Sequence, residues 1–300
     1  MTHRGGVGLR GVVLAVGTIA VGALGVSRLE AAETMNRLAQ NKLASNRLAQ
    51  NRLAQNRLAQ NALSATRLEA IAETAEMLST ADGREVYSYI VSCALSEGTT
   101  IEAVVPGAPD TGPLDSYTCQ SEHCTFQGGL GLAQHWIDRR LDPKGQRWVS
   151  ACLFARVNFH ETAEAISLRG LAPELTVSQD ELELFSLEEG AFFGNLFTDD
   201  DGPIDWNACR GRAEAAGGEP GGLALRDCTE PDPLDPTHTL CGFNDAGDCA
   251  DFSPEFPSPY ACRSFDPEES IFGDCHAAPG DGRWPGLHTY REIITVYVAN

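Results

Sequence analysis

The sequence predicts an α+β fold: a disulfide-stabilised globular domain with early helices, later short strands and long loops, preceded by a short pentapeptide-repeat segment. Three observations predict it. Capped helical patterns occur before residue 160, short strand-like runs occur mainly after it, and all ten cysteines follow residue 92. We expect a signal peptide over 1–31, a basic repeat spacer or stub over 32–70, and an acidic, disulfide-rich domain over 71–300.

The first residues have the pattern of a secretory signal. Arg4 and Arg10 precede an apolar run at Val12–Val26, and small residues at Leu29–Ala31 or Ala23–Gly25 offer cleavage sites. The run is shorter than the roughly 20 apolar residues of a membrane span, so cleavage is favoured over an uncleaved anchor. We therefore expect an exported protein, in the periplasm, at the cell surface or outside the cell, with no membrane span after cleavage.

Residues 36–70 form seven consecutive five-residue repeats of the type NRLAQ. On an α-helix, leucines five residues apart spiral around every face and make no amphipathic stripe. A square β-helix would place them all inward, but seven repeats give fewer than two coils. A disordered spacer, a β-helical stub and a helix all stay open.

Charge divides the chain. Residues 1–70 carry a net charge of about +6 and residues 71–300 about −26, which together give the −20 of the whole chain. The acidic part repels phosphate backbones, so we expect no nucleic-acid partner. The basic repeat is suited to an anionic envelope surface, and a polysaccharide is the other expected partner.

Helix signals mark the early part of the domain. Two segments have the pattern of a capping box, Thr66–Glu69 and Asp82–Glu85. A third helix start is indicated by Asp142 as N-cap, followed by Pro143 at the first helical position. The apolar stripes after them are Leu68, Ile71, Ala75 and Leu78; then Val86, Ile90, Cys93 and Ala94; then Trp148, Val149, Cys152, Leu153 and Val157.

The ten cysteines form an even set, which in an oxidising compartment allows up to five disulfides. Cys93 and Cys152 each lie on the apolar face of a predicted helix, and we expect them to pair where two helices pack. Cys119 and Cys124 are placed to close a hairpin between Tyr117 and Phe126. The pairing of the other six stays open: Cys209, Cys228, Cys241, Cys249, Cys262 and Cys275.

Strand-like runs occur at Ile101–Val105, Ala165–Arg169, Ala191–Phe197 and Glu292–Val298. Residues 199–290 are rich in Gly, Pro and Asp and have no long periodicity. We expect this region to be dominated by loops that disulfides hold in order.

The repeat occurs together with three distinctive blocks: YSYIVSCAL over 87–95, QRWVSACLFARVN over 146–158 and EEGAFFGNLF over 188–197. This combination resembles a family of exported, cysteine-rich proteins from predatory, fruiting-body-forming soil bacteria, over residues 36–300. The resemblance implies export and the pairing of Cys93 with Cys152, and it implies no particular activity.

Two acidic segments carry the only cofactor that we expect, a calcium ion. Calcium takes six to eight oxygen ligands from a curved backbone, and both segments offer several. Neither has the spacing of an EF-hand, and a solvated acidic loop is the alternative reading. The candidate ligands are Asp199, Asp201 and Asp205 in the first segment and Asn244, Asp245, Asp248 and Asp251 in the second.

Aromatic residues offer a second kind of site. Trp136, Trp206 and Trp284 lie in predicted loops, where an exposed ring stacks on a sugar. Packing in the core or in an interface is the alternative for each of them.

No catalytic motif stands out. His160–Glu164 lacks the second histidine of a zinc-protease helix, and no G-x-S-x-G elbow is present. The leading hypothesis is an exported, non-enzymatic binding or structural module held at a surface by its basic repeat. An exported hydrolase of polysaccharide or peptide using Glu188 and Glu189 is the first alternative, and assembly through the repeat is the second. A concave cleft with convergent carboxylates or histidines would favour the hydrolase.

Overall fold

The structure is a computed structural model, and some segments of the chain lie outside the residues that it describes. The described residues are 33–36, 38–39, 58–60, 62–63, 72–111, 117–160, 164–197, 205–215, 226–250, 260–276 and 288–299. They form a mixed α+β fold in which strands predominate, and five disulfides join all ten cysteines. The expected signal peptide and both predicted cleavage sites lie outside them.

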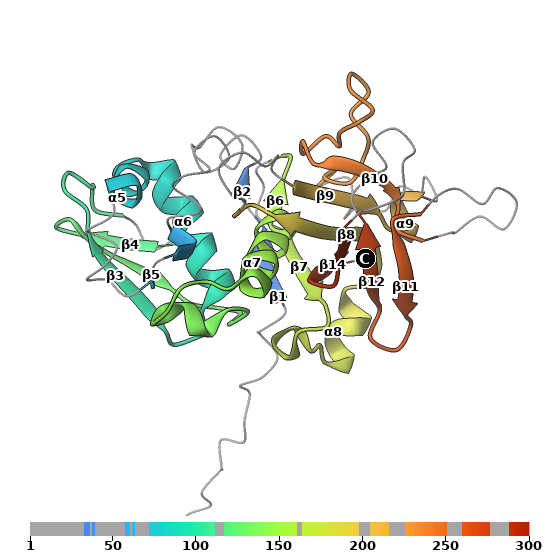
Figure 1. The fold of residues 1–300 in the computed structure, drawn as a ribbon, viewed down its shortest axis with the longest axis horizontal. Coiled ribbons are helices and arrows are strands. Elements are labelled where there is room, and N and C mark those ends of the chain that lie inside the picture. The colour runs from blue at the N-terminus through green and yellow to red at the C-terminus, as the bar shows by residue number, and fades with distance from the viewer. Residues whose placement is uncertain are drawn as a thin grey trace, which may run out of the picture.

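A six-stranded sheet forms the centre of the molecule (Figure 1). Its strands, in spatial order, are β1 (Glu33–Asn36), β7 (Glu164–Arg169), β14 (Ile293–Val298), β8 (Leu187–Asn195), β9 (Asp205–Arg210) and β10 (Asn244–Asp248). All neighbours are antiparallel except β9 and β10, which run parallel. The three predicted strands at Ala165–Arg169, Ala191–Phe197 and Glu292–Val298 are β7, β8 and β14.

Three smaller sheets surround it. One has the order β3 (Thr100–Val104), β5 (His123–Gln127) and β4 (Tyr117–Gln120); another has β11 (Cys262–Asp266), β12 (Ile271–His276) and β13 (Thr289–Tyr290); the smallest pairs β2 (Leu38–Ala39) with β6 (Val157–Asn158). The strands β9 to β13 lie within 199–290, where we expected mainly loops. Each has at most six residues; β11 and β12 form a hairpin, while β10 pairs with β9, which is distant in the sequence.

The three longest helices lie on the left of the large sheet in Figure 1 or at its left edge. The described helices are α5 (Ala72–Ser79), α6 (Ala81–Ala94), α7 (Pro143–Ala155), α8 (Gln179–Leu184) and α9 (Arg212–Ala215), with 3₁₀ turns η1 (Gln134–Ile137) and η2 (Pro173–Leu175). Among the described residues no helix has the length and apolar character to cross a membrane.

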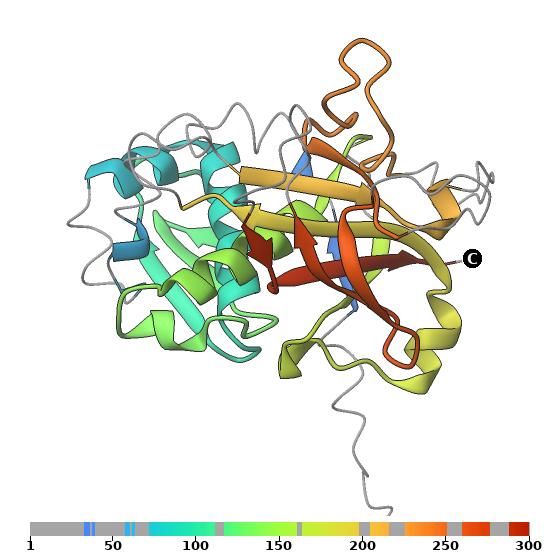
Figure 2. The same ribbon diagram turned by 45° about the vertical axis from the view of Figure 1, so that its right-hand side comes forward.

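Both faces of the large sheet are covered. Helix α7 packs against β8 and β14 on one face, and β12 lies against β14 on the other. Figure 2 shows the β11–β12 hairpin in front of the long strands. Phe192 and Phe193 are neighbours on β8 and belong to separate core clusters, and both are fully buried. Because successive side chains of a strand point to opposite faces of the sheet, these two neighbours fill the hydrophobic cores on both faces.

Side-chain caps set the starts of the two long helices. Asp142 caps α7, because its Oδ1 accepts a hydrogen bond of 2.7 Å from the Gly145 amide, with Pro143 in the first turn as predicted. Helix α6 begins earlier than its sequence pattern indicates. Thr80 is its N-cap, with Oγ1 accepting a bond of 3.0 Å from the Gly83 amide, and Asp82 lies in the first turn. The predicted box at Thr66–Glu69 lies outside the described residues.

Two disulfides join the cysteines that the sequence pairs. Cys93 on α6 is bonded to Cys152 on α7 where these helices pack. Cys119 and Cys124 are bonded across the β4–β5 hairpin, whose register also places Tyr117 opposite Phe126. The remaining pairs are Cys209–Cys249, Cys228–Cys241 and Cys262–Cys275.

The described part of the repeat segment is built into the domain. Strand β1 pairs with β7, and β2 pairs with β6. Leu58, Ala62 and Leu63 are at most 2 % exposed. The Leu63 amide donates to the Trp136 carbonyl at 2.8 Å, and the Ala59 carbonyl accepts from the Leu141 amide at 2.7 Å. These residues therefore pack with the domain expected to begin at 71.

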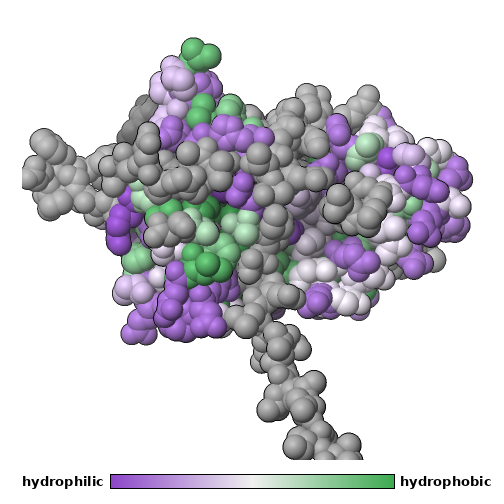
Figure 3. Space-filling model, turned by 180° about the vertical axis from the view of Figure 1, so that it is seen from behind, coloured by the Kyte–Doolittle hydropathy of each residue, from purple (hydrophilic) through white to green (hydrophobic). Residues whose placement is uncertain are grey.

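The described surface is mixed in character. Figure 3 shows hydrophilic residues over much of the face seen from behind, together with one hydrophobic area. The large hydrophobic side chains that are exposed come from separate elements and loops: Val104, Phe159, Leu171, Leu184, Leu234 and Tyr260.

Candidate functional site

A concave site lies where four segments meet, and we call it the η1–η2 cleft. Its volume is about 600 Å³, within the range of roughly 300–1,000 Å³ that is usual for small-ligand sites. It is lined by Leu132, His135, Asp142, Lys144, Gly145, Trp148, Leu171, Ala172, Pro173, Glu174, Arg291 and Glu292. These residues come from η1, the start of α7, η2 and the segment before β14.

The start of α7 brings one wall of the cleft close to η1. Gly145 is buried there, and a Cβ atom at this position would lie 2.6 Å from Leu141 Cδ1 and 3.2 Å from His135 Cε1. Glycine therefore lets Leu141 and His135 approach the start of α7 closely, and a larger residue would require both side chains to shift. Trp148 follows one turn later and is 4 % exposed, so it belongs to the floor of the cleft.

Two carboxylates of the cleft are held by bonds within the protein. Asp142 uses Oδ1 to cap α7, which leaves Oδ2 toward His135. Glu292 is 7 % exposed, and its Oε2 accepts a bond of 2.6 Å from Arg147 Nε. Fixed side chains of this kind are preorganised for recognition, because a ligand does not have to order them.

His135 has a ring nitrogen with no hydrogen-bond partner among the described residues. Its Nε2 lies 3.7 Å from Asp142 Oδ2, beyond hydrogen-bonding distance. The side chain is 22 % exposed, but the Nε2 atom itself is buried, so the ring and not this nitrogen faces the cleft.

The cleft carries charged groups of both signs. Three carboxylates, Asp142, Glu174 and Glu292, line it together with two cations, Lys144 and Arg291. Arg147, which does not line the cleft, binds Glu292 from outside it. The cleft therefore offers both donors and acceptors, in a domain that is otherwise strongly acidic.

A second depression adjoins the cleft at Leu171, which lines both and is 60 % exposed. It has a volume of about 490 Å³. Besides Leu171, it is lined by Ser264, Phe265, Asp266, Pro267, Glu268, Ile271, Phe272 and Gly273, which belong to the β11–β12 hairpin. The two hollows therefore meet at one shared residue, Leu171.

The predicted calcium residues have other partners where they are described. Asp245 and Asp248 lie on β10 and bind Arg210, with Arg210 Nη1 2.9 Å from Asp245 Oδ1 and Arg210 Nε 3.0 Å from Asp248 Oδ1. Burial alone would lower the pKa of Arg210, but the charges and hydrogen bonds of the two carboxylates outweigh it and raise this pKa. Arg210 thus binds three oxygens of these two carboxylates, and the segment expected to be a loop is strand β10. The calcium hypothesis for this segment stays a prediction.

The first acidic segment lies beside the second. Asp205 on β9 accepts a bond of 2.6 Å from Asn207 Nδ2, and Asn244 Nδ2 on β10 donates to Asn207 Oδ1 at 3.3 Å. Burial raises the pKa of Asp205, while the Asn207 bond and the charge of His288 act against this. Asp199, Asp201 and Asp251 lie outside the described residues, and their role as calcium ligands stays a prediction.

The tryptophans do not form an exposed platform where they are described. Trp136 lies in η1 and is fully buried, with its ring edge-on to Phe197 at 5.8 Å between centroids. Trp206 lies on β9, half-buried, and meets Phe243 edge-on at 6.1 Å. Both correct the prediction of loop positions open to a sugar, because these rings pack within the protein. Trp284 lies outside the described residues.

Glu188 and Glu189 bind partners in different parts of the structure. Glu188 accepts from the Arg212 amide at 2.8 Å and from Tyr297 Oη at 2.7 Å. Glu189 accepts from Arg226 Nε at 2.9 Å, and both side chains of this pair are buried. The two carboxylates therefore do not converge on one substrate, contrary to the arrangement that the hydrolase hypothesis needs.

Most of the cleft could not be recognised from the sequence. The cap at Asp142 and Pro143 marks one wall, but 157 positions separate His135 from Glu292 and no spacing links them. Only the fold brings η1, α7, η2 and the start of β14 together. Comparison with protein-family models, with curated proteins and with solved structures finds no match to this chain.

Proposed function

We propose that this chain is an exported, non-enzymatic binding module whose η1–η2 cleft takes a segment of a neutral polysaccharide. The observation that carries the proposal is the set of donors and acceptors of both charges beside an apolar floor, in which Asp142 and Glu292 are held at fixed positions. Sugar hydroxyl groups both donate and accept, so they suit a site that offers both kinds of partner. The C–H faces of a sugar ring suit the apolar floor.

The net charge of the chain favours a neutral ligand. A domain with a net charge of about −26 repels an anionic polymer at long range. Within the cleft a single ion would find its charge opposed by groups of the same sign. A neutral chain of sugars meets neither obstacle.

The adjoining depression favours a linear ligand over a single sugar. A chain that lies in the η1–η2 cleft and passes Leu171 reaches Phe265 and Ser264 on the hairpin. We therefore expect affinity to rise with the length of the oligosaccharide until both hollows are filled.

Export is supported by the five disulfides, since such bonds form and persist in oxidising compartments. The N-terminal signal pattern points the same way. The basic repeat would then hold the acidic domain at an anionic envelope surface. Deleting 41–57 removes basic residues while leaving every described residue in the chain, and retention of the protein at the cell surface should fall.

Isothermal titration with N-acetylglucosamine oligomers of increasing length tests the binding proposal. Glu174→Gln and Lys144→Ala should each weaken binding roughly tenfold, the effect of losing about 1–1.5 kcal/mol from a hydrogen bond. Glu183→Gln on α8, outside the cleft, is the matched control and should bind like the unaltered protein. Equal affinity of all variants, or an affinity independent of length, would contradict this use of the cleft.

A hydrolase acting in the same cleft is the second candidate, because His135 and Asp142 converge there. A histidine beside a carboxylate is a common arrangement for a general base. If the protein releases new reducing ends from the same oligomers and His135→Ala abolishes this release, the hydrolase hypothesis replaces the binding hypothesis. Binding without any release of reducing ends would support the non-enzymatic proposal.

A further inference from the structure

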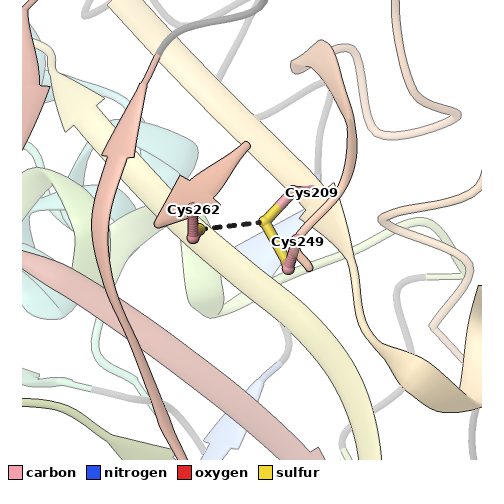
Figure 4. Close-up of side chains that lie close together, drawn as sticks. All are labelled: Cys209, Cys249 and Cys262. Carbon is pink, nitrogen blue, oxygen red and sulfur yellow. Dashed lines mark hydrogen bonds between the residues drawn. A yellow bond between two sulfur atoms is a disulfide. The ribbon is translucent and has the colours of Figure 1, made fainter. Parts of the chain in front are cut away.

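Two disulfides lie against each other on the side of the large sheet away from α7. Cys209 on β9 is bonded to Cys249, which directly follows β10, and Cys262 on β11 is bonded to Cys275 on β12. The Sγ atoms of Cys209 and Cys262 are 3.8 Å apart (Figure 4). All four cysteines are at most 2 % exposed.

Backbone bonds fix this arrangement. The Cys249 amide donates to the Arg210 carbonyl at 2.8 Å, and the Cys262 amide donates to the Cys249 carbonyl at 2.9 Å. Cys262 and Cys275 are directly opposite each other in the β11–β12 register. The two pairs are therefore held together by the strands and not by chance contact of side chains.

The sulfurs of Cys209, Cys249 and Cys262 all lie within 4.8 Å of one another, a spacing that metal ligands also show. In this state each of them is part of a disulfide. A metal ion binds the thiolate, so the oxidised cluster has no thiolate ligand to offer it. The chemistry that remains open to touching disulfides is exchange.

We propose that these four cysteines form a buried thiol–disulfide exchange site whose co-reactant is a dithiol reductant. The reductant supplies two electrons and two protons, opens Cys209–Cys249 to two thiols and becomes a disulfide itself. The Cys209 thiolate then attacks Cys262 Sγ. A Cys209–Cys262 bond forms, the Cys262–Cys275 bond breaks, and Cys275 leaves as a thiolate that takes up the proton lost by Cys209.

Cys275 is the leaving group in this step. Its sulfur is bonded to Cys262, the sulfur that lies 3.8 Å from Cys209, so attack by Cys209 on Cys262 releases Cys275.

Exchange would replace two disulfides, one within each of two sheets, by a single disulfide between the sheets. In the oxidised state one bond ties β9 to the end of β10, and the other ties β11 to β12. The Cys209–Cys262 bond would instead join the six-stranded sheet to the β11–β12 hairpin, the element that lines the second depression. Cys249 and Cys275 would be the free thiols.

Limited reduction of the unaltered protein tests the proposal directly. The protein is treated with low dithiothreitol, quenched with iodoacetamide and mapped by mass spectrometry of peptides. The expected species with four disulfides carries labels on Cys249 and Cys275 and a Cys209–Cys262 cross-link. Labels confined to natively paired cysteines, or reduction of all five disulfides without an intermediate, would overturn it.

A variant removes the need for a reductant. In Cys249→Ser the Cys209 thiol is free from the start, and we expect Cys209–Cys262 with Cys275 available for labelling. Cys241→Ser is the matched control, because it frees the Cys228 thiol. Among the described residues, Cys228 does not belong to a cluster of neighbouring cysteine sulfurs like that of Cys209, Cys249 and Cys262. The label in this control should stay on Cys228. Retention of Cys262–Cys275 in Cys249→Ser, with Cys209 labelled, would also overturn the proposal.

Discussion

Single residues show how this acidic domain accommodates charge inside its core. Arg226 is completely buried, where it donates to Glu189 and, through Nη2, to the Ala155 carbonyl at 2.9 Å. The guanidinium thus joins β8 to the end of α7. Burial raises the pKa of Glu189, and the charge of Arg226 opposes this change. A carboxylate of this kind serves the fold, and removing one partner of such a pair usually costs about 3–5 kcal/mol.

Asp205 gives a prediction for the dependence of stability on pH. Burial raises its pKa in the folded state, so folding is penalised once the pH rises through that pKa, and the penalty is absent below the unfolded pKa of about 4. Asp205→Asn cannot ionise at this position and should be more stable than the unaltered protein at pH 7. The difference should disappear below about pH 4 in urea denaturation.

Asp235 provides the control of opposite sign. Its hydrogen bonds with the Thr237 side chain and amide, and with His238, lower its pKa. Its ionised form therefore stabilises the fold above the unfolded pKa, and this contribution is lost as the pH falls through the lower, folded pKa. Asp235→Asn should be less stable than the unaltered protein at pH 7. The same sign for both variants would contradict the assignment.

Residue roles were harder to predict than residue classes. The sequence marks Trp136 as a loop residue, yet the docked Leu63 amide and the Phe197 ring enclose it. Likewise, no pattern near Asp245 in the sequence predicts its ion pair with Arg210, which is 35 positions away. Such roles depend on contacts between distant segments, and a single sequence carries no record of them.

At the scale of elements, the start of α6 supplies a second prediction. Thr80→Ala removes the side-chain bond to the Gly83 amide and should reduce the free energy of unfolding by about 1 kcal/mol. Asp82→Ala removes only a favourable charge in the first turn and should cost a few tenths of a kcal/mol. Urea denaturation of both variants measures the difference. A larger effect of Asp82→Ala would indicate that Asp82, and not Thr80, is the N-cap, as the sequence pattern predicts.

The elements with strong local signals were the ones that the sequence predicted. Asp142 with Pro143 starts α7, and four apolar runs became strands β3, β7, β8 and β14 within a few residues. The strands of 199–290 have no comparable signal, because they lie among segments rich in Gly, Pro and Asp and none of them is a continuous apolar run. β10, with the sequence NDAGD, owes its state to pairing with β9 and to the Arg210 ion pairs. Tertiary partners overrode local preference there.

At the scale of the whole molecule, the repeat belongs to the core where it is described. Ala62 stands at the position where five preceding copies have Arg or Lys, and it is 2 % exposed. The copy 61–65 thus docks with a small residue in place of the basic one, and the copy before it docks through Leu58 and Ala59. Leu58 and Leu63 flank it in the main hydrophobic cluster.

Ala62→Arg tests this role. It forces a long charged side chain into a packed position, and the free energy of unfolding should fall by about 3 kcal/mol or more. Ala62→Ser keeps the volume small and should cost no more than about 1 kcal/mol. Chemical denaturation distinguishes the two. An arginine variant as stable as the serine variant would show that the segment contributes little to the fold.

The place of β14 in the large sheet has a consequence for biosynthesis. This strand comes last in the chain, yet it lies between β7 and β8, which do not pair with each other. Until the ribosome has made residues 293–298, the β1–β7 and β8–β10 portions have no strand to join them. Long-range pairing of this kind delays folding until the distant strand is available. A polypeptide whose central sheet waits for residues 293–298 therefore keeps its two portions unjoined until that segment has been made.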